Sequence, residues 1–140
     1  MIRVLIVDDS ATTREAISAI LESEPSIQII GQAVDGKQAV EMTEQLKPDV
    51  ITMDINMPEM NGHDATLAIM AKMPTPIVVL SSISQADLVH QGLDILLAGA
   101  LEIVQKPTTL NSQSLEAVRV ELIEKVLAVA QVKFQSTDVP

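Results

Sequence analysis

The sequence of 140 residues contains no cysteine and almost no aromatic side chains, and each absence excludes a class of function. Without cysteine, disulfides and thiolate metal ligands are excluded. Aromatic residues make up 1% of the chain, a single Phe134, so stacking platforms for bases and aromatic cages for cationic ligands are excluded as well. The longest apolar runs are far shorter than a membrane span.

Positive charge is also scarce, since 9 lysine and arginine residues stand against 19 aspartate and glutamate residues. The formal net charge of −10 repels nucleic-acid phosphates and argues against direct binding to nucleic acid. The same excess of carboxylates is compatible with a site for a cation. Because the chain enters a strand-like segment at once, without a signal-peptide pattern, we expect a cytoplasmic protein with no membrane contact.

Short β-branched apolar runs alternate with segments of helical periodicity along the chain. The strand-like runs cover Ile2–Val7, Ile27–Ala33, Val50–Asp54, Ile77–Ser81 and Leu101–Gln105. The helical segments cover Thr12–Ser23, Gly36–Leu46, His63–Lys72, Gln85–Ala98 and a last helix from Asn111 to about Lys133. This alternation predicts an α/β fold with helices on both faces of a parallel sheet. Five strands in so short a chain favour a single domain with the flavodoxin-like, doubly wound order 2-1-3-4-5.

Polar side chains stand at the carboxyl ends of four predicted strands, where doubly wound folds bind their ligands. They are Asp8 and Asp9 after the first strand, Asp54 ending the third, Ser81 ending the fourth and Lys106 after the fifth. Crowded carboxylates repel one another unless a cation intervenes, and Mg²⁺ accepts a few carboxylates together with water and phosphate oxygens. With a lysine beside it, such a cluster can neutralise a phosphoryl group, which Asp54 can accept as an aspartyl phosphate.

These residues lie in motifs that resemble a known family. VDDS (Val7–Ser10), MDINMPEMNG (Met53–Gly62), Ser81 and the pair Lys106-Pro107 are similar to the response-regulator receiver domains of bacterial two-component systems, over residues 2–130. MPTPIVVLSS (Met73–Ser82) is similar to the N-terminal receiver of the chemotaxis protein-glutamate methylesterase family. The resemblance therefore implies a phosphorelay component in chemotaxis.

The resemblance assigns the acidic positions to phosphoryl acceptance and metal binding. Asp54 would be the phosphoacceptor, and a histidine kinase would be the donor. Asp9, Asp54 and the backbone carbonyl of Asn56 would bind Mg²⁺ directly, and Asp8 would bind it through water.

The resemblance also implies how the phosphoryl group is held and how its presence is passed on. Ser81 and Lys106 would contact the phosphoryl group, and the peptide bond between Lys106 and Pro107 would be cis. An effector domain or partner protein would contact the face formed by the fourth helix, the fifth strand and the fifth helix. The family usually has an aromatic switch residue where this chain has Ile103, so a swinging aromatic ring cannot report phosphorylation here.

The last helix has two apolar stripes. Leu115, Val118, Leu122, Val126 and Val129 are expected to face the sheet, and Val120, Ile123, Leu127, Ala130 and Phe134 form the second stripe. A helix that is apolar over so wide an arc predicts a partner beyond its own sheet. We therefore expect Ile103, Ile123 and Leu127 to contribute to an output surface or to a homodimer, although a long linker helix with some apolar residues fits the same pattern.

Other interpretations stay open. We expect residues 1–133 to form the receiver domain and 134–140 to be a tail or the start of a linker to an effector domain. The serine, histidine and aspartate constellation of an esterase would need a further domain, so we expect this chain to catalyse only its own phosphotransfer and dephosphorylation. A stand-alone or DNA-binding-type regulator and an interaction module that is never phosphorylated are alternatives. An aspartate-nucleophile phosphatase is an alternative from another class, but such an enzyme normally has a second aspartate where this chain has Asn56.

Overall fold

The computed structural model describes residues 1–55, 57, 59–81, 93–105 and 112–132. Its strands are β1 (Ile2–Val7), β2 (Ile27–Ala33), β3 (Val50–Asp54), β4 (Ile77–Ser81) and β5 (Glu102–Gln105). Its helices are α1 (Ala11–Glu22), α2 (Gly36–Leu46), α3 (Gly62–Lys72) and α5 (Ser112–Val129), and residues 93–98 are also helical.

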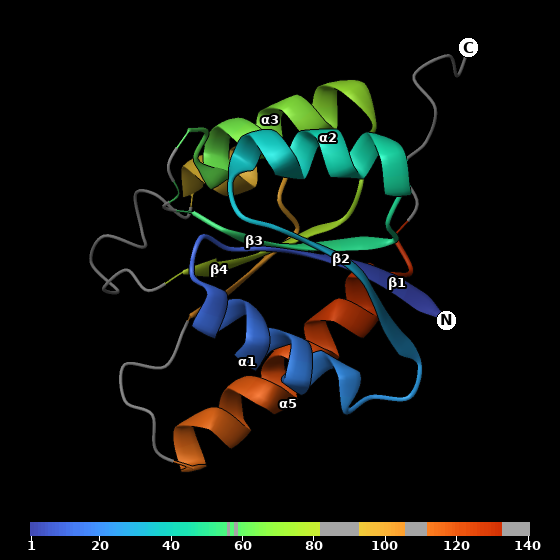
Figure 1. The fold of residues 1–140 in the computed structure, drawn as a ribbon, viewed down its shortest axis with the longest axis vertical. Coiled ribbons are helices and arrows are strands. Elements are labelled where there is room, and N and C mark those ends of the chain that lie inside the picture. Colours follow the sequence, from blue (N-terminus) through green and yellow to red (C-terminus); the bar gives the residue numbers. More distant parts are fainter. Residues whose placement is uncertain (56, 58, 82–92, 106–111, 133–140) are drawn as a thin grey trace.

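The five strands form one parallel sheet in the order β2-β1-β3-β4-β5. Helices α2 and α3 cover one face of the sheet, and α1 and α5 cover the other (Figure 1). The predicted flavodoxin-like α/β fold and strand order are confirmed. The order of the strands reverses beside β1, so the carboxyl ends of β1 and β3 border the point where folds of this kind bind ligands.

The predicted bounds differ from the observed ones at a few helix ends. Four strands and α2 have the predicted bounds, and the fifth strand is one residue shorter. Helix α1 begins at Ala11 because Ser10 is its N-cap, whose hydroxyl accepts a hydrogen bond from the Thr13 amide at 3.3 Å. Helix α5 ends at Val129 rather than near Lys133. The Gln131 and Val132 amides donate to the Ala128 and Val129 carbonyls, the tighter pattern of a 3₁₀ turn that often closes a helix.

Side chains along each strand point alternately to two cores, one on each face of the sheet. On β1, Leu5 and Val7 belong to the first core cluster, whereas Val4 and Ile6 belong to the second. Residues of α2, α3 and the segment 93–98 complete the first cluster, and residues of α1 and α5 complete the second. Because helices cover both faces, β3 and β4 are buried at every position, which explains their continuous apolar runs.

The first apolar stripe of α5 faces the sheet as predicted. Leu122, Val126 and Val129 are buried in the second core cluster, and Val118 packs against it; the side chain of Leu115 lies outside the described part of the chain. Within the second stripe, Ile123, Leu127 and Ala130 are half-buried against the same cluster, whereas Val120 is 45% exposed. Much of this stripe is therefore covered by the chain itself.

Polar side chains fix α5 to its neighbours. The Lys125 ammonium donates to the Ile103 carbonyl of β5 at 3.0 Å and lies 3.6 Å from the Glu102 carboxylate. The Arg119 guanidinium donates to the Ser23 hydroxyl after α1 at 3.2 Å. Its hydrogen bonds and its charge also hold the pKa of the exposed Glu116 carboxyl below the usual value.

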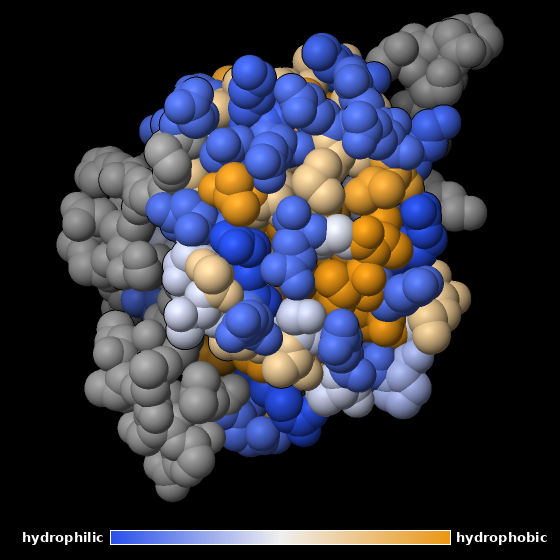
Figure 2. Space-filling view, in the orientation of Figure 1, coloured by the Kyte–Doolittle hydropathy of each residue, from blue (hydrophilic) through white to orange (hydrophobic). Residues whose placement is uncertain are grey.

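The outer surface is mostly polar. Figure 2 shows hydrophilic residues over the outer sides of α2 and α3, and hydrophobic residues in the band between the two helix layers. No helix in the described ranges is long and apolar enough to cross a bilayer.

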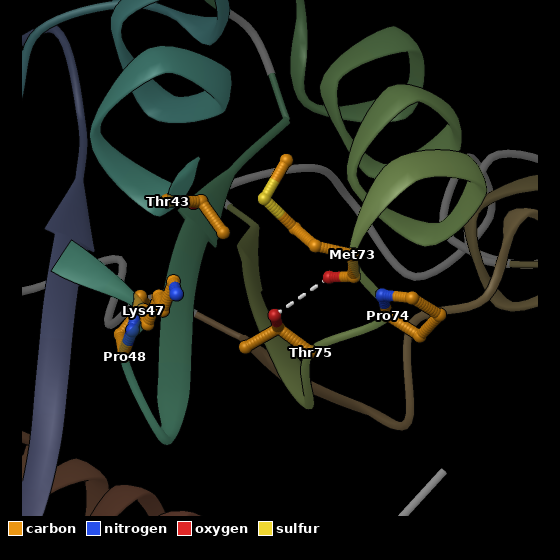
Figure 3. Close-up of a pocket in the computed structure, with 6 residues that line it drawn as sticks. All are labelled: Thr43, Lys47, Pro48, Met73, Pro74 and Thr75. Atoms are coloured by element: carbon orange, nitrogen blue, oxygen red, sulfur yellow. Dashed lines mark hydrogen bonds between the residues drawn. The ribbon is translucent and has the colours of Figure 1, made fainter. Parts of the chain in front are cut away.

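A pocket lies at the amino ends of β3 and β4, away from the predicted site. It is lined by Thr43, Lys47, Pro48, Met73, Pro74 and Thr75 (Figure 3). The Thr75 hydroxyl donates to the Met73 carbonyl at 2.8 Å, and the Thr43 hydroxyl donates to the Ala39 carbonyl at 2.6 Å. Both hydroxyl protons are therefore used within the chain, and Lys47 is the charged residue of the lining.

A buried threonine in the central strand provides a stability test. Among the described residues, the Thr52 and Thr66 hydroxyls are the buried side-chain groups without a hydrogen-bond partner. Thr52→Val keeps the β-branched shape and removes an unsatisfied group, so we expect the free energy of unfolding to rise by about 1 kcal/mol. Urea denaturation followed by circular dichroism measures this change.

Thr43→Val is the matched control, because Thr43 is equally buried and its hydroxyl has a partner. We expect this variant to lose stability or to stay unchanged. A Thr52→Val protein that is no more stable than the wild type would contradict the prediction.

Candidate functional site

Three carboxylates meet at the carboxyl edge of the sheet. Each of Asp8, Asp9 and Asp54 offers one oxygen, and these oxygens all lie within 4.8 Å of one another. The register of the sheet causes this convergence, because Val7 of β1 pairs with Met53 of β3 and the next residue of each strand is an aspartate. The predicted convergence is confirmed for these three carboxylates.

The chain holds Asp8 at both its backbone and its side chain. Asp8 is 1% exposed, and its amide donates to the Ala33 carbonyl of β2 at 3.1 Å. Its carboxylate accepts from the Ser10 amide at 2.9 Å, and its carbonyl accepts from the Arg14 guanidinium at 2.7 Å. The turn from β1 to α1 is therefore fixed, and Asp9, which follows Asp8, is left exposed to solvent.

Asp54 ends β3 with 6% of its surface exposed, and glycine shapes the chain after it. The Gly62 amide donates to the Ile55 carbonyl at 2.7 Å, and a Cβ on Gly62 would lie 2.2 Å from the Asp54 carbonyl oxygen. Only glycine permits so close an approach. Asn61 caps α3 by accepting from the Asp64 amide at 2.9 Å, so the loop closes directly into that helix.

The end of β4 lies next to Asp54, because Leu80 pairs with Asp54 and Ser81 follows it, and β5 is the next strand beyond β4. Ser81 is 1% exposed at the end of β4 and pairs in register with Gln105, the last residue of β5. Ile103 is half-buried against the first core cluster, so it does not present its whole side chain at the surface. The predicted site residues Asn56, Lys106 and Pro107, and with them the predicted cis peptide bond, lie outside the described residues.

The chemistry of this donor set fits a hard divalent cation. Its oxygens are all carboxylate oxygens, two of the residues are buried and one is exposed, so an ion can enter from solvent. Without a cation, carboxylates this close repel one another, and solvent screens the exposed Asp9 more strongly than the buried Asp8 and Asp54. A positive ion relieves that repulsion, and an ion with open coordination positions can also bind phosphate oxygens.

Sequence reasoning did not find two contacts that hold this site. One is the hydrogen bond from Arg14 to the Asp8 carbonyl. The other joins the Gly36 amide of α2 to the Met60 carbonyl in the loop after Asp54, at 2.9 Å. The Asp35-Gly36 pair signals a turn, but no local pattern shows which distant carbonyl it contacts.

Comparison with known proteins agrees with the geometry. The family model of the response regulator receiver domain matches residues 4–119. The chain belongs to this family. It is a receiver domain of the kind found in CheB-type methylesterases, as the sequence predicted.

Two proteins illustrate this similarity. The protein-glutamate methylesterase/protein-glutamine glutaminase 2 of Carboxydothermus hydrogenoformans is 48% identical over 130 residues, which are 93% of this chain and 36% of the relative. The response regulator domain of Thermotoga maritima CheB is 41% identical with a TM-score of 0.86, covering 95% of this chain and 98% of that one. The chain spans little more than a third of the length of the curated relatives.

A third receiver domain was solved with a metal. The receiver of a sensor histidine kinase from Pseudomonas aeruginosa, with a magnesium ion coordinated in its active site cleft, has a TM-score of 0.75 and 26% identity. The match covers 93% of this chain and 98% of that one.

The repulsion between the three carboxylates can be measured. In the presence of a chelator, Asp9→Asn removes one charge from the cluster, so we expect the free energy of unfolding to rise by about 1 kcal/mol at low salt and by less at high salt. Chemical denaturation at the two ionic strengths gives both values.

Glu15→Gln removes an exposed charge from α1, outside the cluster, and serves as the control. We expect it to leave the stability nearly unchanged. If both variants gained equally, overall net charge rather than the cluster would be the cause.

Proposed function

We propose that this receiver domain accepts a phosphoryl group on Asp54 from a phosphohistidine of a histidine kinase. The observation that carries the proposal is the buried strand-end carboxylate of Asp54, held within 4.8 Å of Asp8 and Asp9. A carboxylate oxygen of Asp54 attacks phosphorus and the phosphorus–nitrogen bond breaks. The imidazole nitrogen leaves with the bonding electrons and takes a proton from solvent. The product is an acyl phosphate on Asp54.

We further propose that Mg²⁺ is the cofactor. Asp9, Asp54 and the Asn56 carbonyl would bind it directly and Asp8 through water, and bound Mg²⁺ would neutralise charge on the phosphoryl oxygens. The all-oxygen donor set supports this ion, as does the magnesium in the Pseudomonas aeruginosa receiver. Ser81 lies at the adjacent strand end, where its hydroxyl would donate to a phosphoryl oxygen. Lys106 would pair with the same group.

The output of the domain is proposed from its relatives. Their names indicate that the effector is a protein-glutamate methylesterase domain. Residues 1–133 would be the receiver and 134–140 the start of a linker to that domain. The proposed contact face contains β5, α5 and the helical segment 93–98, on which Leu93 and Leu97 are 57% and 77% exposed.

Several further features stay predictions. A cytoplasmic location suits a partner of histidine kinases. A homodimer through Ile103, Ile123 and Leu127 would use only the parts of these side chains that the core leaves uncovered.

The acceptor residue can be tested directly. Acetyl phosphate with Mg²⁺ should label the wild type, seen as the mass of one phosphoryl group in intact-protein mass spectrometry. Asp54→Asn should abolish the label, because the amide is not a nucleophile of comparable strength.

Asp35→Asn is the matched control. Asp35 caps α2 through its side chain, and asparagine caps equally well, so this variant should fold and take the label. Persistent labelling of Asp54→Asn would refute the assignment of the acceptor.

The metal can be tested without phosphorylation. Because an ion that binds only the folded state stabilises it, millimolar Mg²⁺ should raise the Tm of the wild type. Asp9→Asn should lose most of this gain, whereas Glu15→Gln should keep it. An equal Mg²⁺-dependent rise in all three proteins would show that the ion binds elsewhere.

A further inference from the structure

The first turn of α2 contacts the loop that follows Asp54. The Gly36 amide, at the first residue of α2, donates to the Met60 carbonyl at 2.9 Å. Helices α2 and α3 lie side by side on one face of the sheet, and both begin at the edge where Asp54 ends β3 (Figure 1). This hydrogen bond therefore joins the turn after β2 to the loop between β3 and α3.

The contact is too close for any residue other than glycine. A Cβ on Gly36 would lie 2.2 Å from the Met60 carbonyl oxygen and 2.8 Å from its carbonyl carbon. Both atoms belong to the backbone, so no change of side-chain rotamer can make room. A Cβ on Gly31, in β2, would instead meet the end of the Met42 side chain at 2.8 Å, which can move.

A described residue of the loop has an unusual backbone conformation. Glu59 has a φ of 66°, a left-handed conformation that residues other than glycine adopt only where their surroundings impose it. Gly62 fixes the far end of the loop against Ile55, and the Met57 and Met60 side chains pack against the first core cluster. The Gly36 hydrogen bond adds a contact from outside the loop, because it joins the first residue of α2 to the Met60 backbone.

We propose that Gly36 is a positioning residue for phosphoryl transfer, which holds the loop after Asp54 in the shape that the site requires. The proposal rests on the proposed function. Catalysis of phosphoryl transfer depends almost wholly on positioning and on the neutralisation of charge, so a displaced loop slows transfer even in a folded protein. Asp54 both accepts the phosphoryl group and binds the metal in the proposed function, so a displaced loop would also weaken metal binding.

Gly36→Ala tests the proposal, with Gly31→Ala as the matched control. The Cβ that Gly36→Ala adds must push the Met60 backbone away, so we expect the maximal rate of labelling by acetyl phosphate to fall about tenfold or more. The dissociation constant of Mg²⁺, measured by calorimetry without phosphodonor, should rise several-fold. Gly31→Ala should lower the Tm and leave both quantities close to their wild-type values.

The outcomes separate the two proposals. If the wild type takes no label, the proposed function fails. The dissociation constants of Mg²⁺ for Gly36→Ala and Gly31→Ala still test whether Gly36 holds the loop in place. A folded Gly36→Ala protein with wild-type rate and Mg²⁺ affinity would overturn the inference, as would equal losses in Gly31→Ala.

If Gly36→Ala does not fold, hydrogen exchange in the wild type decides. The proposal expects Mg²⁺ to slow exchange of the Gly36 amide, because an ordered loop keeps the Met60 acceptor in place, and to leave the Gly31 amide unchanged. An unchanged Gly36 amide would overturn it.

Discussion

The parallel register of β1 and β3 is the constraint on which the rest of the structure depends. Pairing Val7 with Met53 places Asp8 and Asp9 beside Asp54, whether or not their charges favour it. The two core clusters provide the stabilisation that keeps the strands in this register, because a slip of one residue would turn every side chain to the wrong face. The apolar layers thus hold three carboxylates together, and a cation bound among them would relieve their mutual repulsion.

The architecture was predictable from the sequence because each level of the pattern agrees with the others. Apolar runs such as Val50–Asp54 match strands that are buried on both faces, and the alternation with helical segments leaves one common topology for a chain of this length. The acidic cluster was predictable for a related reason. In a parallel sheet all carboxyl ends meet at one edge, so a polar residue after each strand is enough to place a site there.

The contacts that fix the site's shape were not predictable in the same way. Arg14 looks like any arginine on an amphipathic helix, and only the observed turn shows its guanidinium at the Asp8 carbonyl. Gly36 fits an ordinary turn, and its partner Met60 is remote in the sequence. The apolar stripe with Ile123 and Leu127 predicts a surface for a partner, but the sequence pattern does not show that the second core cluster covers part of both side chains. Such contacts depend on how helices and strands pack against one another, and the periodicity of a short sequence segment does not show this packing.

The first core cluster connects the site to the rest of the domain. Met57 and Met60, in the loop after Asp54, pack against the same core cluster as Ile103 of β5. Because densely packed protein interiors transmit strain, a displacement of the loop would be felt at β5 through this cluster. Lys125 extends the connection, because its hydrogen bond to the Ile103 carbonyl ties β5 to α5. Apolar packing and the Lys125 hydrogen bond thus connect the loop after Asp54 to β5 and α5, in a chain that has isoleucine rather than an aromatic residue at position 103.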